Sequence, residues 1–384
     1  MVRNPQANPF RFGDLALDDA FTDRATEVRE LKSDMRNGQN VVVFAPRRHG
    51  KSSLLWRAAH ELIRKREVLV GQVDLMKTPT KERLAAKLAA TIYEDIASPL
   101  FRARDRATSI FRGLRVEPTM TLDVDGAIGF SFRGGLTGED IDATLEHLLE
   151  LPARLAADRD RRVALVFDEF QEVVGIDRHL LALMRSVFQE QPDVSHVYLG
   201  SKRHMMERIF NDENEPFWRA AKHMELGPIP VPQFTRFIRS RFERSGRGIE
   251  DEVISLLLTV THCHPYGTQE LAYALWEATP ADGRADEQRL GDALVRVLHS
   301  EHAHFERIWE NAARAQRITL EALARQPGQP PMSAAYRRTH GLPGTSTVQR
   351  ALESLGHDEL IERWQSGYRI AEPFLAEWII RADV

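Results

Sequence analysis

One eight-residue segment constrains the fold of this chain more than any other feature of its sequence. Ala45-Pro46-Arg47-Arg48-His49-Gly50-Lys51-Ser52 follows the apolar run Val41–Ala45 and opens the helical pattern Ser52–Lys65. It matches the phosphate-binding pattern G-x-x-x-x-G-K-[ST], except that Ala45 stands in place of the first glycine. In such loops, successive backbone N–H groups and a helix N-terminus point at phosphates. The segment therefore predicts a nucleotide site between a buried strand and a helix.

The loop positions have distinct expected roles. Lys51 is expected to bridge the β- and γ-phosphates, and the Ser52 hydroxyl to ligate Mg²⁺. Gly50 is expected to let the backbone approach the phosphates, where a Cβ would obstruct it. The alternative for the loop alone is a chance Gly-Lys-Ser. Its arginines either steer the triphosphate, contact a partner subunit or are solvated surface charges. The other candidate nucleotide-binding positions are Ala45, Pro46, Arg47, Arg48, His49 and Ser53.

A second segment supports the predicted nucleotide site and argues against a chance match of the phosphate-loop pattern. The apolar run Val163–Asp168 ends in the pair Asp168-Glu169. Asp168 is expected to hold the water shell of Mg²⁺, which takes few direct carboxylates. Glu169 is expected to orient and deprotonate the attacking water, with Glu172 or Gln171 as the next candidates. The alternative is a pair of solvated carboxylates. Together the two segments predict an ATPase domain that binds ATP or ADP with Mg²⁺.

The apolar runs and helical patterns between them predict an α/β fold. Strands that alternate with helices indicate a parallel sheet covered on both faces. The segment Thr119–Phe132 alternates around Asp125-Gly126, which predicts an inserted β-hairpin. The five predicted strands of the sheet are Val41–Ala45, Val68–Asp74, Val163–Asp168, Val194–Gly200 and His223–Leu226.

Three prolines at positions 228, 230 and 232 indicate a domain boundary. We expect an ATPase core over 1–229, a helical lid over 230–315 and a winged helix-turn-helix over 316–384. In the last segment, Thr345 or Ser346 is expected to cap the third helix, and Gln365-Ser366-Gly367 to form the wing. The helices predicted in these two parts are Phe234–Phe242, Asp251–Thr261, Thr268–Ala278, Glu287–Glu310, Arg317–Ala324, Ser333–His340 and Thr347–Leu355.

The charge of the winged-helix segment is uneven. Residues 316–351 hold five arginines and one glutamate, a balance of +4, whereas residues 352–384 hold three arginines and seven acidic residues, a balance of −4. The second helix of a helix-turn-helix, here the third helix of the segment, enters the major groove, and neighbouring basic side chains contact phosphates. The candidate DNA-binding residues are Thr345, Ser346, Thr347, Gln349 and Arg350 for bases, and Arg337 and Arg338 for phosphates.

Several motifs resemble those of AAA-related STAND and archaeal-type ATPases, whose relatives include the origin-recognition ATPases. Phe21, Arg24 and Glu27 match the F-x-x-R-x-x-E element that precedes the phosphate loop in those families. The resemblance covers nearly the whole chain. The other matching segments are Asn8-Pro9-Phe10, Asp168-Glu169-Phe170-Gln171-Glu172, Gly200-Ser201-Lys202-Arg203, Glu215-Pro216-Phe217-Trp218-Arg219-Ala220-Ala221-Lys222, His264-Pro265-Tyr266-Gly267-Thr268-Gln269 and Tyr368-Arg369-Ile370-Ala371-Glu372-Pro373-Phe374.

This resemblance implies roles for further residues. Phe21 and Arg24 would lie beside the adenine, and His264-Pro265 would start a lid helix that closes over the nucleotide. Ser201 would be the sensor that bonds the γ-phosphate or the attacking water. The sheet would have the strand order 5-1-4-3-2. The segment before the fifth strand lacks the Gly-Arg pair of many relatives. The candidates for the arginine finger are therefore Arg219 and Lys222, and the alternative is that these residues are surface charges.

Composition limits the remaining function classes. The 52 basic and 56 acidic residues give a net charge of −4, which excludes bulk binding of polyanions. The one cysteine, Cys263, excludes an intrachain disulfide and disfavours a zinc site with His262 and His264. No secretory signal or apolar run of about 20 residues is evident, so we expect a cytoplasmic protein with no membrane partner.

Two functions remain, both resting on a slow ATPase. In the first, the nucleotide state controls a winged helix that binds double-stranded DNA or assembles on it. In the second, a STAND-type scaffold, the winged helix binds protein and the nucleotide controls homo-oligomerisation. A small-molecule kinase is disfavoured, because such kinases need neither a helical lid nor a winged helix.

Overall fold

The computed structural model describes residues 7–16, 21–97, 110–111, 119–122, 128–132 and 137–382. Two compact units make up the chain. The core unit comprises Arg24–Arg47 and Lys51–Gly227, and the accessory unit comprises Met1–Asp23, Arg48–Gly50 and Pro228–Val384. The three-part division drawn from the sequence stays a prediction.

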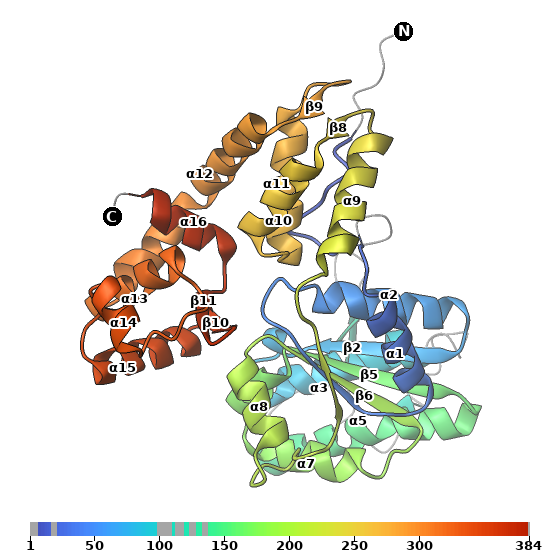
Figure 1. Ribbon diagram of the computed structural model, residues 1–384. Coiled ribbons are helices and arrows are strands. Elements are labelled where there is room, and N and C mark those ends of the chain that lie inside the picture. The colour runs from blue at the N-terminus through green and yellow to red at the C-terminus, as the bar shows by residue number, and fades with distance from the viewer. Residues whose placement is uncertain are drawn as a thin grey trace. The chain divides into compact units, whose positions relative to one another are not determined.

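A five-stranded parallel sheet forms the centre of the core unit (Figure 1). Numbered among themselves along the chain, its strands have the order 5-1-4-3-2, as predicted, and each predicted strand is within one residue of the observed one. Across the sheet the strands are β2 (Val68–Asp74), β5 (Arg162–Asp168), β6 (Val194–Gly200), β1 (Val41–Phe44) and β7 (Lys222–Glu225).

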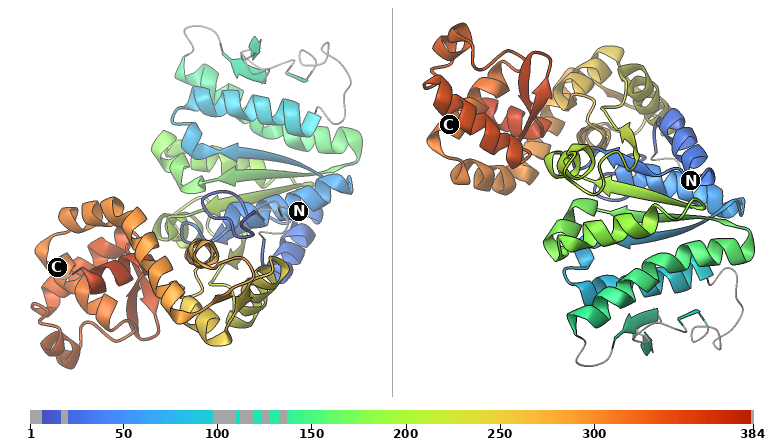
Figure 2. Two further views of the ribbon diagram at one scale, coloured as in Figure 1. Left: turned by 90° about the horizontal axis from the view of Figure 1, so that it is seen from above. Right: turned by 90° about the horizontal axis from the view of Figure 1, so that it is seen from below.

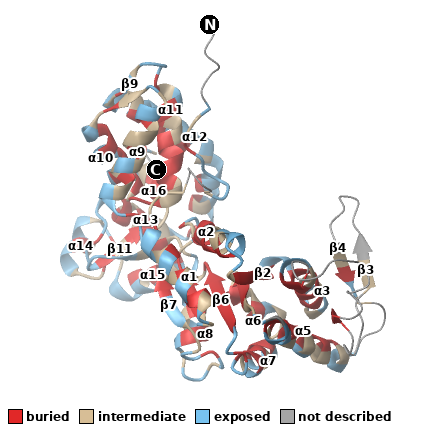
Figure 3. Ribbon diagram, turned by 90° about the vertical axis from the view of Figure 1, so that its right-hand side faces the viewer, coloured by how far each residue is buried: buried red, intermediate tan, exposed pale blue. Residues whose placement is uncertain are grey.

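Helices cover both faces of this sheet (Figure 2). On one face lie α1 (Ala25–Arg36) and α2 (Lys51–Arg64), and on the other lie α3 (Lys81–Thr91), α5 (Gly138–Arg159) and α7 (His179–Phe188). The central strands β1 and β6 are buried at every residue, and β5 is buried between its two end residues (Figure 3), because a parallel sheet with helices on both sides has no solvated face.

The smaller elements of the core unit include the predicted inserted hairpin. Its strands β3 (Thr119–Leu122) and β4 (Ile128–Ser131) pair antiparallel, whereas the predicted turn at Asp125-Gly126 lies outside the described residues. The remaining elements are the 3₁₀ turns η2 (Leu75–Lys77) and η6 (Phe170–Glu172), the π-helical turn η3 (Ile92–Ala97), and the helices α6 (Val173–Ile176) and α8 (Arg203–Asn211).

Four helices form the first part of the accessory unit. Phe10 is buried against Phe237 and Phe242, and Asn8 donates to the Tyr273 carbonyl at 3.2 Å. The N-terminal segment 7–16 therefore packs with these helices. They are α9 (Val231–Arg244), α10 (Asp251–Thr261), α11 (Pro265–Ala278) and α12 (Glu287–Asn311), with a short parallel pair β8 (Gly248–Ile249) and β9 (Arg284–Ala285).

The predicted winged helix completes the accessory unit and shares one apolar cluster with the four helices. Gly344 is the N-cap of the third helix, so the predicted cap at Thr345 or Ser346 is wrong. The helix starts earlier than the pattern indicated, because the Thr347 and Val348 N–H groups already bond the Gly344 carbonyl. The elements are α13 (Arg314–Arg325), α14 (Ala334–Thr339), α15 (Thr345–His357), β10 (Ile361–Trp364), β11 (Gly367–Ile370) and α16 (Pro373–Arg381).

No helix within the described residues has the length and apolar character needed to cross a bilayer.

Candidate nucleotide-binding site and winged-helix surface

The phosphate-loop lysine is the first residue of α2, directly after the loop that follows β1. Lys51 is buried, and its Nζ donates to the carbonyls of Ala45 at 2.8 Å and Pro46 at 3.1 Å. Its ammonium is therefore held at the loop by backbone oxygens. Ser52 is half-buried and Ser53 buried in the first turn of α2, where backbone N–H groups have no partner within the helix.

Two positions of the loop have left-handed backbone angles, Arg48 with φ +62° and Gly50 with φ +85°. Apart from Gly50 itself and its two chain neighbours, no protein atom among the described residues lies within 4 Å of where a Cβ on Gly50 would be. The backbone angle alone therefore gives a reason for glycine there. Ala45 is buried and has no positive φ, which explains why this first position accepts alanine.

Arg48 and His49 group with the accessory unit and contact side chains within it. The Arg48 guanidinium lies 4.2 Å from the centre of the Tyr266 ring, and its Nη1 is 3.9 Å from Glu372 Oε2. The His49 ring meets the His264 ring edge-on, with centroids 4.5 Å apart.

His264 and Pro265 start α11, as the sequence predicts. His264 is the N-cap, its Nδ1 accepts from the Gly267 N–H at 3.2 Å, and Pro265 occupies the first helical position. Proline is favoured there because its missing N–H would have no partner in the helix. A role of these two residues at the nucleotide stays a prediction.

The Asp168 carboxylate ends β5 and lies among other charges of the core unit. Its Oδ1 accepts from the Glu169 N–H at 3.0 Å, and its Oδ2 from Gln72 Nε2 at 3.3 Å. Burial raises the pKa of Asp168, the charges of Glu169 and Asp74 raise it further, and the Lys51 ammonium opposes them. Asp74, which ends β2 in register with Asp168, was missed by the sequence reasoning although it too is a carboxylate at a strand end.

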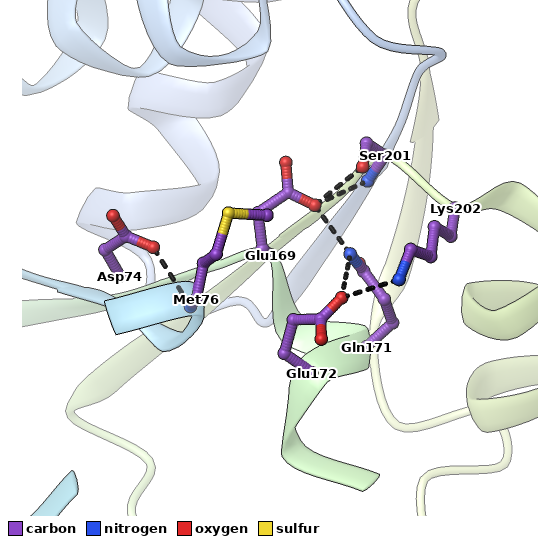
Figure 4. A network of polar contacts seen from close by, with 7 residues as sticks. All are labelled: Asp74, Met76, Glu169, Gln171, Glu172, Ser201 and Lys202. Carbon is purple, nitrogen blue, oxygen red and sulfur yellow. Dashed lines mark hydrogen bonds and ion pairs between the residues drawn. The ribbon is translucent and has the colours of Figure 1, made fainter. Parts of the chain in front are cut away.

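Glu169 follows directly, with a left-handed backbone angle (φ 52°) that is uncommon for a residue with a side chain. Its Oε2 accepts from the Ser201 hydroxyl at 2.7 Å, the Ser201 N–H at 3.3 Å and Gln171 Nε2 at 2.6 Å (Figure 4). The parallel pairing of β5 with β6 brings these residues together. The structure thus places the predicted base next to the predicted sensor.

The residues present suit a magnesium ion. Carboxylate and hydroxyl oxygens are the ligands that Mg²⁺ prefers, and it keeps several waters. Asp168 supplies a carboxylate whose negative charge is disfavoured by Glu169 and Asp74, and a divalent cation would offset that repulsion. Within the described ranges, no group of three or more His, Cys, Asp or Glu could hold a metal. A site here would therefore depend on water and phosphate oxygens as well.

The residues of the F-x-x-R-x-x-E element are divided between the units. Arg24 caps α1, is buried, forms an ion pair with Glu27 at 3.1 Å and donates to the Gly227 carbonyl, all within the core unit. Phe21 is half-buried and belongs to the accessory unit. Arg24 therefore ties α1 to the segment after β7, and adenine binding by either residue stays a prediction.

The two finger candidates differ in their contacts. The Arg219 side chain is exposed, with its guanidinium 4.9 Å from the ring centre of Trp218, which is itself exposed. Lys222 Nζ lies 2.8 Å from Glu30 and 2.9 Å from Asp34, and these carboxylates raise its pKa. Lys222 therefore has an intramolecular role on α1, whereas Arg219 extends from a turn with φ 52°.

The predicted DNA-binding side chains lie on α14 and the start of α15 in the accessory unit. Thr347 is half-buried, and Arg337 is half-buried with its Nε donating to the Met332 carbonyl at 3.3 Å. The exposed face also carries Glu353, which accepts from Gln349 at 3.0 Å. Its position four residues after Gln349 could have identified it. The exposed candidates are Arg338, Thr345, Ser346, Gln349 and Arg350.

The sheet, the phosphate loop and the carboxylates at the end of β5 define a P-loop ATPase joined to a winged helix. Residues 21–260 match the model of an ATPase domain predominantly from Archaea, and residues 303–381 match a probable winged helix domain. The chain belongs to this family of ATPases, found mostly in Archaea.

Solved structures share this fold. A Walker-type ATPase of Pyrococcus abyssi superimposes with a TM-score of 0.65 at 18% identity, over 95% of this chain and 97% of that one. The ADP form of the Aeropyrum pernix ORC2 protein gives a TM-score of 0.50 at 15% identity, over 96% and 97%. A search of curated proteins finds no match.

Proposed function

We propose that this protein is an ATP-hydrolysing switch whose nucleotide state controls its winged helix. ATP would bind at the phosphate loop, with Lys51 at the β- and γ-phosphates. The oxygen of a water would form a bond to the γ-phosphorus while the bond to the β–γ bridging oxygen breaks, giving ADP and phosphate. Glu169 would take the proton of that water.

The observation that carries this proposal is the meeting of three elements at the carboxyl ends of adjacent strands. Glu169 follows β5, Ser201 follows β6 and the phosphate loop follows β1, and these strands are neighbours in the order β5-β6-β1. Ligands of open parallel sheets bind beyond the carboxyl ends of the strands. Ser201, already bonded to Glu169, would also contact the γ-phosphate or the water.

Magnesium would be held by the Ser52 hydroxyl and by Asp168 through its water shell. The ion would neutralise charge on the phosphate oxygens. The protein's own part is to place one carboxylate for the ion and a second for the water, and the two are adjacent in sequence but bonded to different groups.

A basic side chain from a neighbouring copy would complete the hydrolytic site. Both side chains are exposed, and we favour Arg219 over Lys222 because Lys222 is engaged by Glu30 and Asp34. Turnover by isolated molecules would then be slow, since an arginine supplied by a partner raises hydrolysis by orders of magnitude in related enzymes.

The output we propose is contact with double-stranded DNA. Exposed hydroxyl, amide and guanidinium groups begin α15, the helix that enters the major groove in such modules. Arg337 and Arg338 on α14 would contact phosphates. The alternative is a protein partner with nucleotide-controlled self-association. It is supported by Glu353 on the same face of α15 and by Trp364, exposed beside the wing.

The deciding experiment is the steady-state ATPase rate with and without duplex DNA, at low and moderate salt, with Glu169→Gln as the blank. Stimulation that fades with salt would support the DNA output, because phosphate contacts are salt-dependent. A rate indifferent to DNA, together with nucleotide-dependent self-association, would support the protein-binding alternative. Accumulation of a phosphorylated small molecule in place of free phosphate would overturn the reaction class.

A further inference from the structure

A glutamine in the turn after β5 is buried against the candidate catalytic carboxylate. Gln171 lies in η6 and has no exposed surface. Its Nε2 donates to Glu169 Oε2 at 2.6 Å and is 3.4 Å from Glu172 Oε1 (Figure 4). The orientation of the amide follows from these partners, because a flipped amide would set its oxygen against two carboxylates.

The oxygen end of the Gln171 amide is buried in an unfavourable environment. Gln171 Oε1 has no hydrogen-bond partner among the described residues, and burying an amide oxygen without one is unfavourable. It packs against Gly200, where a Cβ would lie 2.8 Å from Oε1 and 2.4 Å from the Met206 side chain. An apolar side chain of the same length would fill this space without that cost, so the Nε2 bonds give the reason for glutamine.

Those bonds restrict how the Glu169 carboxylate can turn. The Ser201 hydroxyl, the Ser201 N–H and Gln171 Nε2 all reach the same oxygen, Oε2. With Oε2 fixed from three sides, Oε1 is the oxygen that can accept a proton from water. On the outer side, Lys202 Nζ lies 2.9 Å from Glu172 Oε1, the atom on which the Gln171 amide also rests.

We propose that Gln171 is a positioning residue for ATP hydrolysis. Its amide holds Glu169 so that Oε1 faces the attacking water, and the Lys202–Glu172 ion pair holds the amide in turn. This inference rests on the proposed role of Glu169 as the base. A positioned carboxylate matters because a displacement of about 1 Å can lower turnover by as much as 100-fold.

The main test is Gln171→Met, which keeps the length of the side chain and removes both N–H groups. We expect kcat for ATP hydrolysis to fall about tenfold, while KM and the binding of ATP in the absence of turnover stay within about twofold. The matched control is Gln191→Met, since Gln191 is also buried in the core unit with an unpartnered Oε1, and its Nε2 donates only to the Leu149 carbonyl at 2.9 Å among the bonds described. A loss of kcat in the control as large as in Gln171→Met would overturn the inference.

Two further variants separate this inference from the proposed function. In a Glu169→Gln background, Gln171→Met should cause no further loss in single-turnover hydrolysis, because the group it positions is gone. Wild-type turnover in Glu169→Gln would refute the base itself. An inactive Glu169→Gln together with an unimpaired Gln171→Met would refute only the positioning role.

The outer ion pair gives a test that leaves the buried side chains intact, should Gln171→Met fail to fold. Lys202→Met should lower kcat about threefold with KM unchanged, because Glu172 then holds the Gln171 amide less firmly. Lys65→Met, an exposed lysine after α2, is the control. Equal kcat in the two lysine variants would count against a role of the Lys202–Glu172 ion pair in holding the Gln171 amide.

Discussion

Polar side chains at the end of β5 and β6 in the core unit differ sharply from those on α15 in the accessory unit. Gln171 and Ser201 are almost fully buried, and both donate to Glu169. Gln349 and Arg350 are exposed, and their bonds go to other residues of α15. The first set is arranged before any ligand binds, which suits a reaction that needs fixed geometry. The second set can adapt, so its geometry alone does not select a ligand.

Two glutamates, Glu169 half-buried and Glu270 buried, extend this contrast to carboxylates. In the core unit, Glu169 Oε2 has three donors. In the accessory unit, Glu270 on α11 is 4% exposed, and its Oε2 has no partner among the described residues. A buried carboxyl group without donors prefers its proton. The same residue type should therefore respond to substitution in opposite ways in the two units.

The largest expected effect concerns the candidate nucleotide site of the core unit, where the polar side chains are arranged before a ligand binds. Lys51→Ala should weaken the binding of ATP about 100-fold or more, because it removes the ammonium that the Ala45 and Pro46 carbonyls hold at the loop. Isothermal titration with ATP in the presence of Mg²⁺ measures this, and Lys65→Ala controls for the loss of charge. Affinity within about threefold of wild type would place the phosphates elsewhere.

Replacing the carboxylate should separate binding from chemistry. Glu169→Gln should retain ATP binding and lower turnover about 100-fold or more, since a general base contributes at least that factor. Phosphate release at saturating ATP is the measurement, and Glu190→Gln, an exposed glutamate of the core unit, is the control. Turnover equal to wild type would move the base to another residue.

The packing of Gly200 against Gln171 and Met206 should not tolerate an added methyl group. Gly200→Ala would set a methyl 2.4 Å from the Met206 Cγ and Sδ atoms and 2.8 Å from Gln171 Oε1. We expect a loss of about 1–3 kcal/mol in the free energy of unfolding by urea, with reduced kcat. Gly175→Ala, where nothing lies within 4 Å of the new methyl, should change stability by less than about 1 kcal/mol. Similar losses in the two variants would show that this packing is not tight.

Motif spacing and uniform apolar runs made the fold and the centre of the site predictable. The runs Val41–Ala45 and Val163–Phe167 contain apolar residues alone, which marks strands covered on both sides. Glu169 and Gln171 were both candidates from the sequence, but their bond was not foreseeable. It depends on the side-chain geometry of a 3₁₀ turn that no local pattern specifies.

The start of α15 shows a different limit. Gly344, Thr345 and Ser346 are adjacent residues that all suit an N-cap. The choice among them follows from which register buries Val348 and Leu352 in the cluster of the accessory unit. That register is a property of the packed fold. Glu353 was missed for a simpler reason, because its charge was counted with the acidic half of the segment although it shares a helix face with Gln349.

Substitutions of the exposed side chains on α14 and α15 should have smaller effects, and these effects should depend on salt. Arg338→Ala with Arg350→Ala should weaken the binding of duplex DNA about tenfold at low salt and reduce the salt slope by about two, because each arginine would neutralise one phosphate. Fluorescence anisotropy with a labelled duplex measures both. Arg296→Ala with Arg307→Ala removes the same charge from the exposed face of α12. An equal loss of affinity in both pairs would indicate attraction by overall charge rather than a surface on α14 and α15.

The last expected effect concerns Glu270 and depends on pH. Burial raises its pKa to about 8, the charges of Glu301 and Glu372 add to this, and Arg48 opposes them, whereas its ordinary value is 4.5. Between these two pH values the unfolded chain releases the proton and the folded one retains it, so wild-type stability falls as pH rises from about 4.5 to about 8. Glutamine has no such proton to lose.

Glu270→Gln should therefore melt close to wild type at acidic pH and above it at alkaline pH, with the gap widening as pH rises from about 4.5 to about 8. Thermal melts at a series of pH values measure this, with Glu306→Gln, an exposed glutamate of α12, as the control. A gap that stays constant with pH would show that Glu270 is ionised in the folded protein. In that case donors must reach it as they reach Glu169, and the contrast between the two units would not extend to these two carboxylates.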